Sequence, residues 1–210
     1  MNMLLGMHDK CMLLSLEMSK REIAYRMMSC VSEVPFSKIQ RWNVFDPDKR
    51  KVKAAKEVLK SRGIVLYDEP MTFPEIKSKI NMNVDKYWIK IVFIDYLQII
   101  REHWKFQNKA SFLTHVTSEL KQVAKRKNIV IVFWAQLNRA YEKDNTPMLS
   151  HLKDSWSIEQ DCDMVIAMQK DVEMDDLTVH ILKCRNWQTW YYKTKMIWHL
   201  FLIKDYETHY

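Results

Sequence analysis

Polar residues that could do chemistry follow the ends of successive apolar segments along this chain. They are Glu17, Asp95, Gln136, Lys183 and Arg185. The carboxyl ends of parallel strands meet at one edge of a sheet, where α/β proteins bind ligands. A carboxylate there can orient water or hold a metal ion, and a fixed cation can stabilise developing negative charge. One such residue could be chance, but the series predicts a site.

Asp95 has the clearest setting of these residues. It lies within IVFIDYLQII (residues 91–100), where four apolar residues precede it without alternation, as in a strand buried on both faces. Because a hard cation prefers an oxygen anion on a rigid element, Asp95 is a candidate ligand of Mg²⁺. The alternative is an aspartate that caps the turn after the strand, and the decapeptide alone does not separate the two.

The elements that must position these residues alternate between short apolar runs and helical patterns. Strands are predicted at 11–16, 64–67, 91–95, 129–133, 164–168 and 177–182, with a strand pair near 196–203. Helices are predicted from residue 19 to about 28, and at 49–61, 72–81 and 111–125, and a loop at 138–160. This alternation predicts an α/β fold with a mostly parallel sheet and helices on both faces.

Length and composition indicate one domain, residues 1–210. With 210 residues and 48% hydrophobic content, the chain can bury one good core. No apolar run reaches the roughly 18 residues of a membrane span, and the start lacks the pattern of a signal peptide, so we expect a cytoplasmic protein without membrane contact. The net charge of +7 suits a polyanionic partner, although a solvated basic surface is the alternative.

The four cysteines do not form a pattern typical of a metal site. Cys11, Cys30, Cys162 and Cys184 are scattered along the chain, and no histidine lies at the spacing of a zinc site. We expect buried, reduced thiols.

Five segments together resemble the ATPase domain of replicative DNA helicases of the DnaB family. In chain order they are SLEMSKREIAYRMMS, IVFIDYLQII, AQLNRA, PMLSHLKDSWSIEQDCDMVI and KCRNW. The resemblance extends from residue 11 to about residue 203. It implies a RecA-like P-loop NTPase core that uses ATP and Mg²⁺, assembles as a homo-hexamer and moves on single-stranded DNA. A primase and a helicase loader are the further partners that it implies.

The resemblance also implies roles for individual residues. Glu17 corresponds to the glutamate that polarises the attacking water, and Asp95 to the aspartate that holds Mg²⁺. Gln136 corresponds to the γ-phosphate sensor, and the basic pair that reaches the neighbouring subunit's phosphates corresponds to Lys183 and Arg185. The family's DNA-binding loop corresponds to Lys153, Asp154, Ser155 and Trp156. For each residue, an ordinary hydrogen-bonding role is the alternative.

Other functions remain open beside the helicase motor. A non-catalytic remnant that binds DNA or associates with a ring is one alternative. A RecA-type recombinase ATPase is another, but it would not be expected to carry SLEMS together with SIEQD.

The sequence departs from the family at the phosphate loop. Members carry a Gly-rich loop that ends in Lys-Thr about one helix before the SLEMS strand, and it cradles the phosphates. The 210 residues contain no such motif, since the two glycines are Gly6 and Gly63. We therefore expect a domain truncated before this Walker A loop, without the first strand of the sheet, which binds ATP poorly and is inactive as this fragment.

Glycine and tryptophan counts form a second departure. The chain has 2 glycines and 8 tryptophans, whereas average usage would give about 15 glycines. Tryptophan stands where the family usually has glycine at Trp42, Trp156, Trp187 and Trp190. One hypothesis is a UGA codon that means glycine in the source but was translated as tryptophan. The alternative is a diverged copy with bulky loops.

Overall fold

The structure is a computed structural model that describes residues 1–210 except 103–105, 139–140, 142–145, 153–155, 172–175 and 206–210. The helices are α1 (Asn2–Gly6), α2 (Lys20–Ser32), α3 (Phe36–Gln40), α4 (Asp48–Ser61), α5 (Phe73–Tyr87), α6 (Lys109–Lys127) and α8 (Trp156–Asp161), with short 3-10 turns η1 (Leu97–Ile99), η2 (Leu149–His151) and η3 (Trp198–Leu200). The strands are β1 (Cys11–Ser15), β2 (Val65–Tyr67), β3 (Ile91–Asp95), β4 (Val130–Phe133), β5 (Met164–Lys170), β6 (Asp176–Cys184), β7 (Trp190–Ile197) and β8 (Leu202–Asp205). Within the described part of the chain, no helix is long and apolar enough to cross a membrane.

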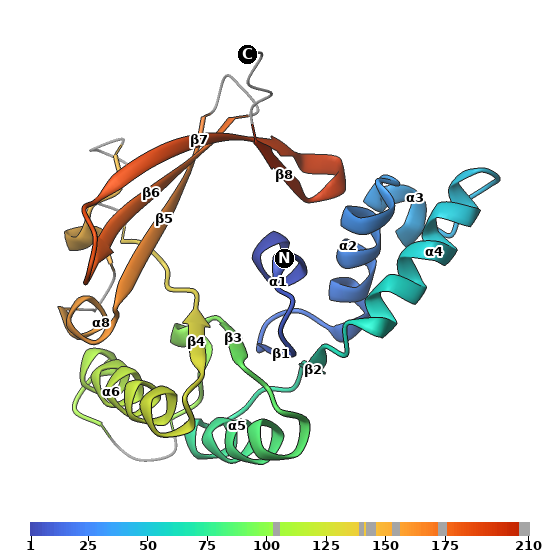
Figure 1. Cartoon of the computed structure of the whole chain (residues 1–210). Coiled ribbons are helices and arrows are strands. Elements are labelled where there is room, and N and C mark those ends of the chain that lie inside the picture. Colours follow the sequence, from blue (N-terminus) through green and yellow to red (C-terminus); the bar gives the residue numbers. More distant parts are fainter. Residues whose placement is uncertain (103–105, 139–140, 142–145, 153–155, 172–175, 206–210) are drawn as a thin grey trace.

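A four-stranded parallel sheet forms the centre of the α/β core, in the order β2-β1-β3-β4 (Figure 1). The predicted strand at 91–95 is confirmed as β3, and it pairs with β1 on one side and β4 on the other. Its four apolar residues are all buried, since helices cover both faces. The α/β fold class is therefore confirmed.

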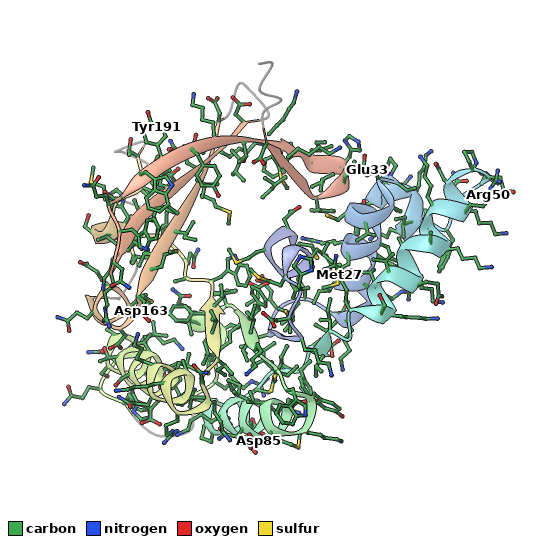
Figure 2. The ribbon with its side chains drawn as sticks, in the orientation of Figure 1. Met27, Glu33, Arg50, Asp85, Asp163 and Tyr191 are labelled. Atoms are coloured by element: carbon green, nitrogen blue, oxygen red, sulfur yellow. The ribbon has the colours of Figure 1, made fainter. Side chains whose placement is uncertain are left out.

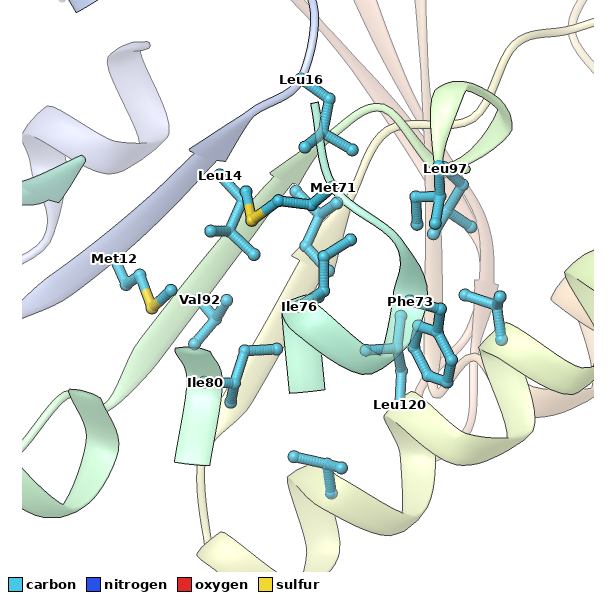
Figure 3. Packing of buried hydrophobic residues seen from close by; sticks show 14 of the residues in the cluster. Met12, Leu14, Leu16, Met71, Phe73, Ile76, Ile80, Val92, Leu97 and Leu120 are labelled. Carbon is cyan, nitrogen blue, oxygen red and sulfur yellow. The ribbon is translucent and has the colours of Figure 1, made fainter. Parts of the chain in front are cut away.

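Alternate residues of the central strands pack into two separate clusters. Met12 and Leu14 of β1 face α5 and α6 in the larger cluster (Figure 3). Leu13 of β1 and Phe93 of β3 belong to the second cluster, which contains side chains of α1 and α2. Because both faces are apolar, the strands read as unbroken apolar runs in the sequence.

Helix α5 begins as predicted and ends later than predicted. Glu75 Oε2 accepts hydrogen bonds from the backbone N–H and the hydroxyl of Thr72, both at 2.7 Å, as in a capping box. The predicted end near residue 81 was six residues early, because buried Asn83 and Val84 continue the inward face. The helix stops where Trp88 takes a left-handed conformation.

The last four strands form a separate antiparallel sheet in the order β5-β6-β7-β8. The sequence predicted a strand pair only at 196–203, whereas β7 begins at Trp190 and β8 ends at Asp205. This sheet arches toward the N-terminal helix (Figure 1), and Asn2 joins them. Its amide donates to the Phe201 carbonyl at 2.8 Å and accepts from the Ile203 N–H at 3.0 Å.

Candidate functional site

Glu17 and Asp95 lie at neighbouring strand ends. Ser15, the last residue of β1, is the register partner of Asp95, the last residue of β3. The Leu16 N–H donates to the Asp95 carbonyl at 2.8 Å, which ties the chain just before Glu17 to β3. The Glu17 carboxylate is close enough to raise the pKa of Asp95. The structure thus brings together the two carboxylates that the sequence singled out.

The pKa of the Asp95 carboxyl is raised, which favours its neutral form. Burial is the main cause that raises its pKa above the ordinary value of 3.8, and the Glu17 charge adds to it. The N-terminal ammonium and Arg26 act in the opposite direction. A nearby divalent cation would relieve this penalty, and carboxylate oxygens on rigid strand ends are donors that Mg²⁺ prefers. The donor chemistry of this edge fits Mg²⁺.

The raised pKa of Asp95 predicts a pH-dependent gain in stability for Asp95→Asn. The folded pKa lies above the unfolded one, so the ionised carboxylate destabilises the fold at neutral pH. Denaturant unfolding at pH 7 should show a higher free energy of unfolding for the variant. The gain should shrink as pH falls through the folded pKa and vanish below about 3.8, where both states are protonated.

Asp85→Asn is the matched control for this measurement. The Asp85 side chain is 65% exposed and pairs with Lys127 at 2.7 Å, so its loss should change stability by less than about 1 kcal/mol. A loss of stability at pH 7 on Asp95→Asn would contradict the penalty inferred for the carboxylate.

Gln136 lies between the Asp95 edge and the predicted DNA loop. Just before it, the Trp134 N–H donates to the Ile94 carbonyl at 3.1 Å. Just after it, Leu137 forms an antiparallel bridge with Leu152. Backbone contacts therefore connect the end of β3 to residue 152 through the segment that carries Gln136.

Most of the predicted DNA loop lies outside the described residues. This applies to Lys153, Asp154 and Ser155. The backbone of Trp156 begins helix α8, but its side chain is not among those that the structure describes. The flanking residues of the loop are placed by the Leu137–Leu152 bridge and by α8.

Lys183 lies near the end of β6 in the antiparallel sheet, and Arg185 lies in the turn that follows this strand. Lys183 Nζ donates to the Glu159 carbonyl of α8. The Arg185 guanidinium pairs with Asp163 at 3.1 Å, and its side chain is 56% exposed. Figure 2 shows Asp163 at the end of the second sheet near α6. Both cations act on Asp163, whose pKa they help to lower, and both belong to the segment at the end of β6 rather than to the parallel sheet that carries Asp95.

Helix α8 is anchored to α6 and supports the basic pair. Ile158 is 2% exposed within the larger core cluster, and the Thr117 hydroxyl donates to the Asp161 carboxylate at 2.6 Å. Cys162 directly follows α8, and burial raises the pKa of its thiol to about 11, so that this thiol stays protonated at neutral pH. All four cysteines are free in the structure.

Sequence reasoning missed two residues that the structure makes noteworthy. Asp163 binds both Lys121 and Arg185, and these hydrogen bonds and charges lower its pKa, with Lys121 as the largest cause. Gln98 follows Asp95 by three residues, and both polar atoms of its amide are buried and have no hydrogen-bond partner among the described residues. A buried unpaired amide costs about 1–3 kcal/mol and suggests a polar ligand nearby. The sequence could have indicated Gln98, because it is a lone polar residue within the apolar run after Asp95.

The two glycines do not provide a phosphate cradle. Gly6 is the last residue of α1, and Gly63 follows α4 with φ of 61° and donates to the Lys60 carbonyl at 3.3 Å. Both positions are helix ends rather than a loop between a strand and a helix N-terminus, which is where phosphates are held. The two glycines of the 210 residues therefore supply no cradle for the phosphates of a nucleotide.

The family model "DnaB-like helicase C terminal domain" matches residues 1–199. The replicative DNA helicase DnaB of Leifsonia xyli subsp. xyli is 31% identical over 160 residues, which are 75% of this chain and 35% of that protein. The corresponding helicase of Mycobacterium intracellulare is 32% identical over 167 residues, which are 77% of this chain and 29% of that protein. The chain spans about a third of the length of these curated relatives.

Two solved structures share the fold. One, described as an ATPase domain, has a TM-score of 0.88 and 25% identity, and the match covers 95% of this chain and 75% of that one. The other is a DnaB-like replicative helicase described with its interactions with primase, with a TM-score of 0.87 and 25% identity over 93% of this chain and 50% of that one.

Proposed function

The chain belongs to the DnaB-like helicase C-terminal domain family, and we propose from this that it is the motor domain of an ATP-dependent replicative DNA helicase. The observation that carries the proposal is a pair of carboxylates: Asp95 ends β3, and Glu17 follows by two residues the end of β1, where Ser15 is the register partner of Asp95. In such a pair, one carboxylate could hold a metal ion beside the phosphates while the other orients the attacking water. Phosphate release by a chain that also contains a Gly-rich Lys-Thr loop tests the proposal.

Each site residue has one task in this proposal. Asp95 would hold Mg²⁺, which neutralises phosphate charge when bound. Glu17 orients the attacking water and accepts its proton, for which an exposed carboxylate beside Asp95 is suited. Gln136 reports the state of the γ-phosphate to the DNA loop through the Leu137–Leu152 bridge.

Lys183 and Arg185 serve the neighbouring subunit in the proposed ring. Within one chain they lie at the end of β6, in the other sheet from Asp95, and we propose that they complete a site across an interface. An exposed guanidinium can stabilise transition-state charge on a neighbour's phosphates. We therefore propose a homo-hexamer in which each site uses two chains.

The proposed partners follow from the family and the charge. The net charge of +7 favours single-stranded DNA, a polyanion. Primase is a proposed partner because one structural neighbour is described with it, and a helicase loader is proposed by analogy. A cytoplasmic location accords with this replicative role.

Two edge strands could accept a further strand that leads into a Gly-rich loop. β4 ends the parallel sheet and β5 ends the antiparallel sheet, and terminal strands leave backbone groups open to a further strand. We propose that the strand before a Gly-rich loop pairs with β4 or β5.

One observation favours the alternative of a non-catalytic remnant: the 210 residues themselves contain no such loop.

Binding to single-stranded DNA should depend on Lys153. If this residue holds a phosphate, Lys153→Ala should weaken binding about equally for all sequences. It should also flatten the slope of log affinity against log salt by about one unit per contact. Fluorescence titrations at several salt concentrations measure both quantities. Lys53→Ala, exposed on α4, removes the same charge elsewhere and should leave the slope nearly unchanged. An unchanged slope for Lys153→Ala would remove this residue from the DNA site.

A further inference from the structure

Two tryptophans have a left-handed backbone conformation. Trp42 has φ of 52° and Trp88 has φ of 59°. A Cβ atom makes this region costly, and a bulky side chain there is a genuine outlier. Among the described residues, five non-glycine residues have such positive φ values, and two of them are tryptophan. Tryptophan makes up only 8 of the 210 residues, so two of these five positions are more than its overall share would give.

Both tryptophans end a helix in the way that glycine usually does. The Trp88 N–H donates to the Val84 carbonyl at 3.0 Å and terminates α5. After α3, the Asn43 N–H donates back to the Lys38 carbonyl at 3.0 Å, which places Trp42 in the left-handed position of a Schellman-type turn. Gly63 performs the same task after α4 with φ of 61°. The backbone at 42 and 88 therefore has the conformation that glycine adopts at least cost.

The rings at these two positions contribute little burial. Trp42 is 67% exposed and Trp88 is 74% exposed, although tryptophan is highly buried on average. The Trp42 ring makes an edge contact with Tyr25, with the ring centroids 6.3 Å apart. Trp134 shows the contrast, since it is half-buried and its ring lies 6.0 Å from that of Phe93 in the core. The Trp88 side chain in particular gains too little burial to offset the free-energy cost of its left-handed backbone.

We propose that positions 42 and 88 are glycine in the protein as its source makes it, because the source reads as glycine a codon that is written here as tryptophan. Trp88 lies outside the motifs that first raised this hypothesis, so its conformation supports the hypothesis independently. The proposal concerns the identity of the residues and does not depend on the proposed helicase activity.

Thermal unfolding of the 210-residue chain provides the physical test. Trp88→Gly should raise the melting temperature by about 2–4 °C, since it removes the Cβ cost. Trp88→Ala removes the ring but keeps the Cβ atom, so it should give clearly less of the gain. Trp134→Gly should lower the melting temperature, because it removes the contact with Phe93. A fall on Trp88→Gly, or an equal rise on Trp88→Ala, would overturn the proposal.

Peptide masses from the source organism provide a test that does not depend on folding. Peptides that cover positions 42 and 88 should have the mass of glycine at both, and the gene should use one codon for the two positions. A peptide with the mass of tryptophan at position 88 refutes the proposal regardless of the melting temperatures.

Discussion

Glu17→Gln should lower the rate of ATP hydrolysis by about 10²–10⁴-fold in a chain joined at its N-terminus to a Gly-rich Lys-Thr loop. That chain should carry the source's own residue at each tryptophan position. The amide is nearly isosteric but cannot accept the proton of the attacking water, so the loss should fall on kcat rather than on nucleotide affinity. Phosphate release with Mg²⁺ and single-stranded DNA measures it.

Glu57→Gln is the matched control for this substitution. Glu57 is exposed on α4 and pairs only with its helical neighbour Lys60 at 3.0 Å among the ion pairs of the described residues. Its loss changes the net charge in the same way and should leave turnover near that of the parent. If Glu17→Gln retained the parent's kcat, Glu17 would not be the residue that activates water.

Arg185→Ala should lower hydrolysis by about 10³–10⁵-fold in the same joined chain, because in the proposed ring this cation would reach the neighbour's phosphates. Within its own chain Arg185 pairs with Asp163 and is more than half exposed, so its removal should hardly change folding. Arg50→Ala removes the same charge as a control: Arg50 is exposed on α4, and Figure 2 shows it on the opposite side of the molecule from Asp163.

Mixed rings distinguish a role across the interface from a role within one chain. Subunits with Arg185→Ala retain Glu17, and subunits with Glu17→Gln retain Arg185, so some interfaces in a mixture contain both residues. Partial activity should return on mixing two inactive variants. If mixtures that form rings stay as inactive as their components, Arg185 does not act on the neighbouring subunit.

The carboxylate edge could be predicted because its signals are local. An unbroken apolar run that ends in Asp95 identifies a strand covered on both faces, and the structure places it in the sheet interior. The neighbouring position of Glu17 followed from strands that share one sheet edge, and the register of Ser15 with Asp95 realises it. These features required only periodicity and the geometry of parallel sheets.

Other features depend on contacts between distant segments and could not be read from local patterns. The pairing of Asp163 with Lys121 joins residues 42 apart, and that with Arg185 depends on the register of β5 with β6. Helix α5 extends past its predicted end because Val84 packs into a core that only the folded sheet creates. The backbone of Trp88 is left-handed at a residue type that predicts the opposite.

Phosphate release with Mg²⁺ and single-stranded DNA, measured on the 210-residue chain beside the joined chain, tests the central claim most directly. We expect background rates from the 210 residues, which contain no phosphate cradle, and DNA-stimulated turnover from the joined chain that Glu17→Gln abolishes. Turnover by the 210 residues alone that Glu17→Gln abolishes, or a folded joined chain without turnover, would contradict it.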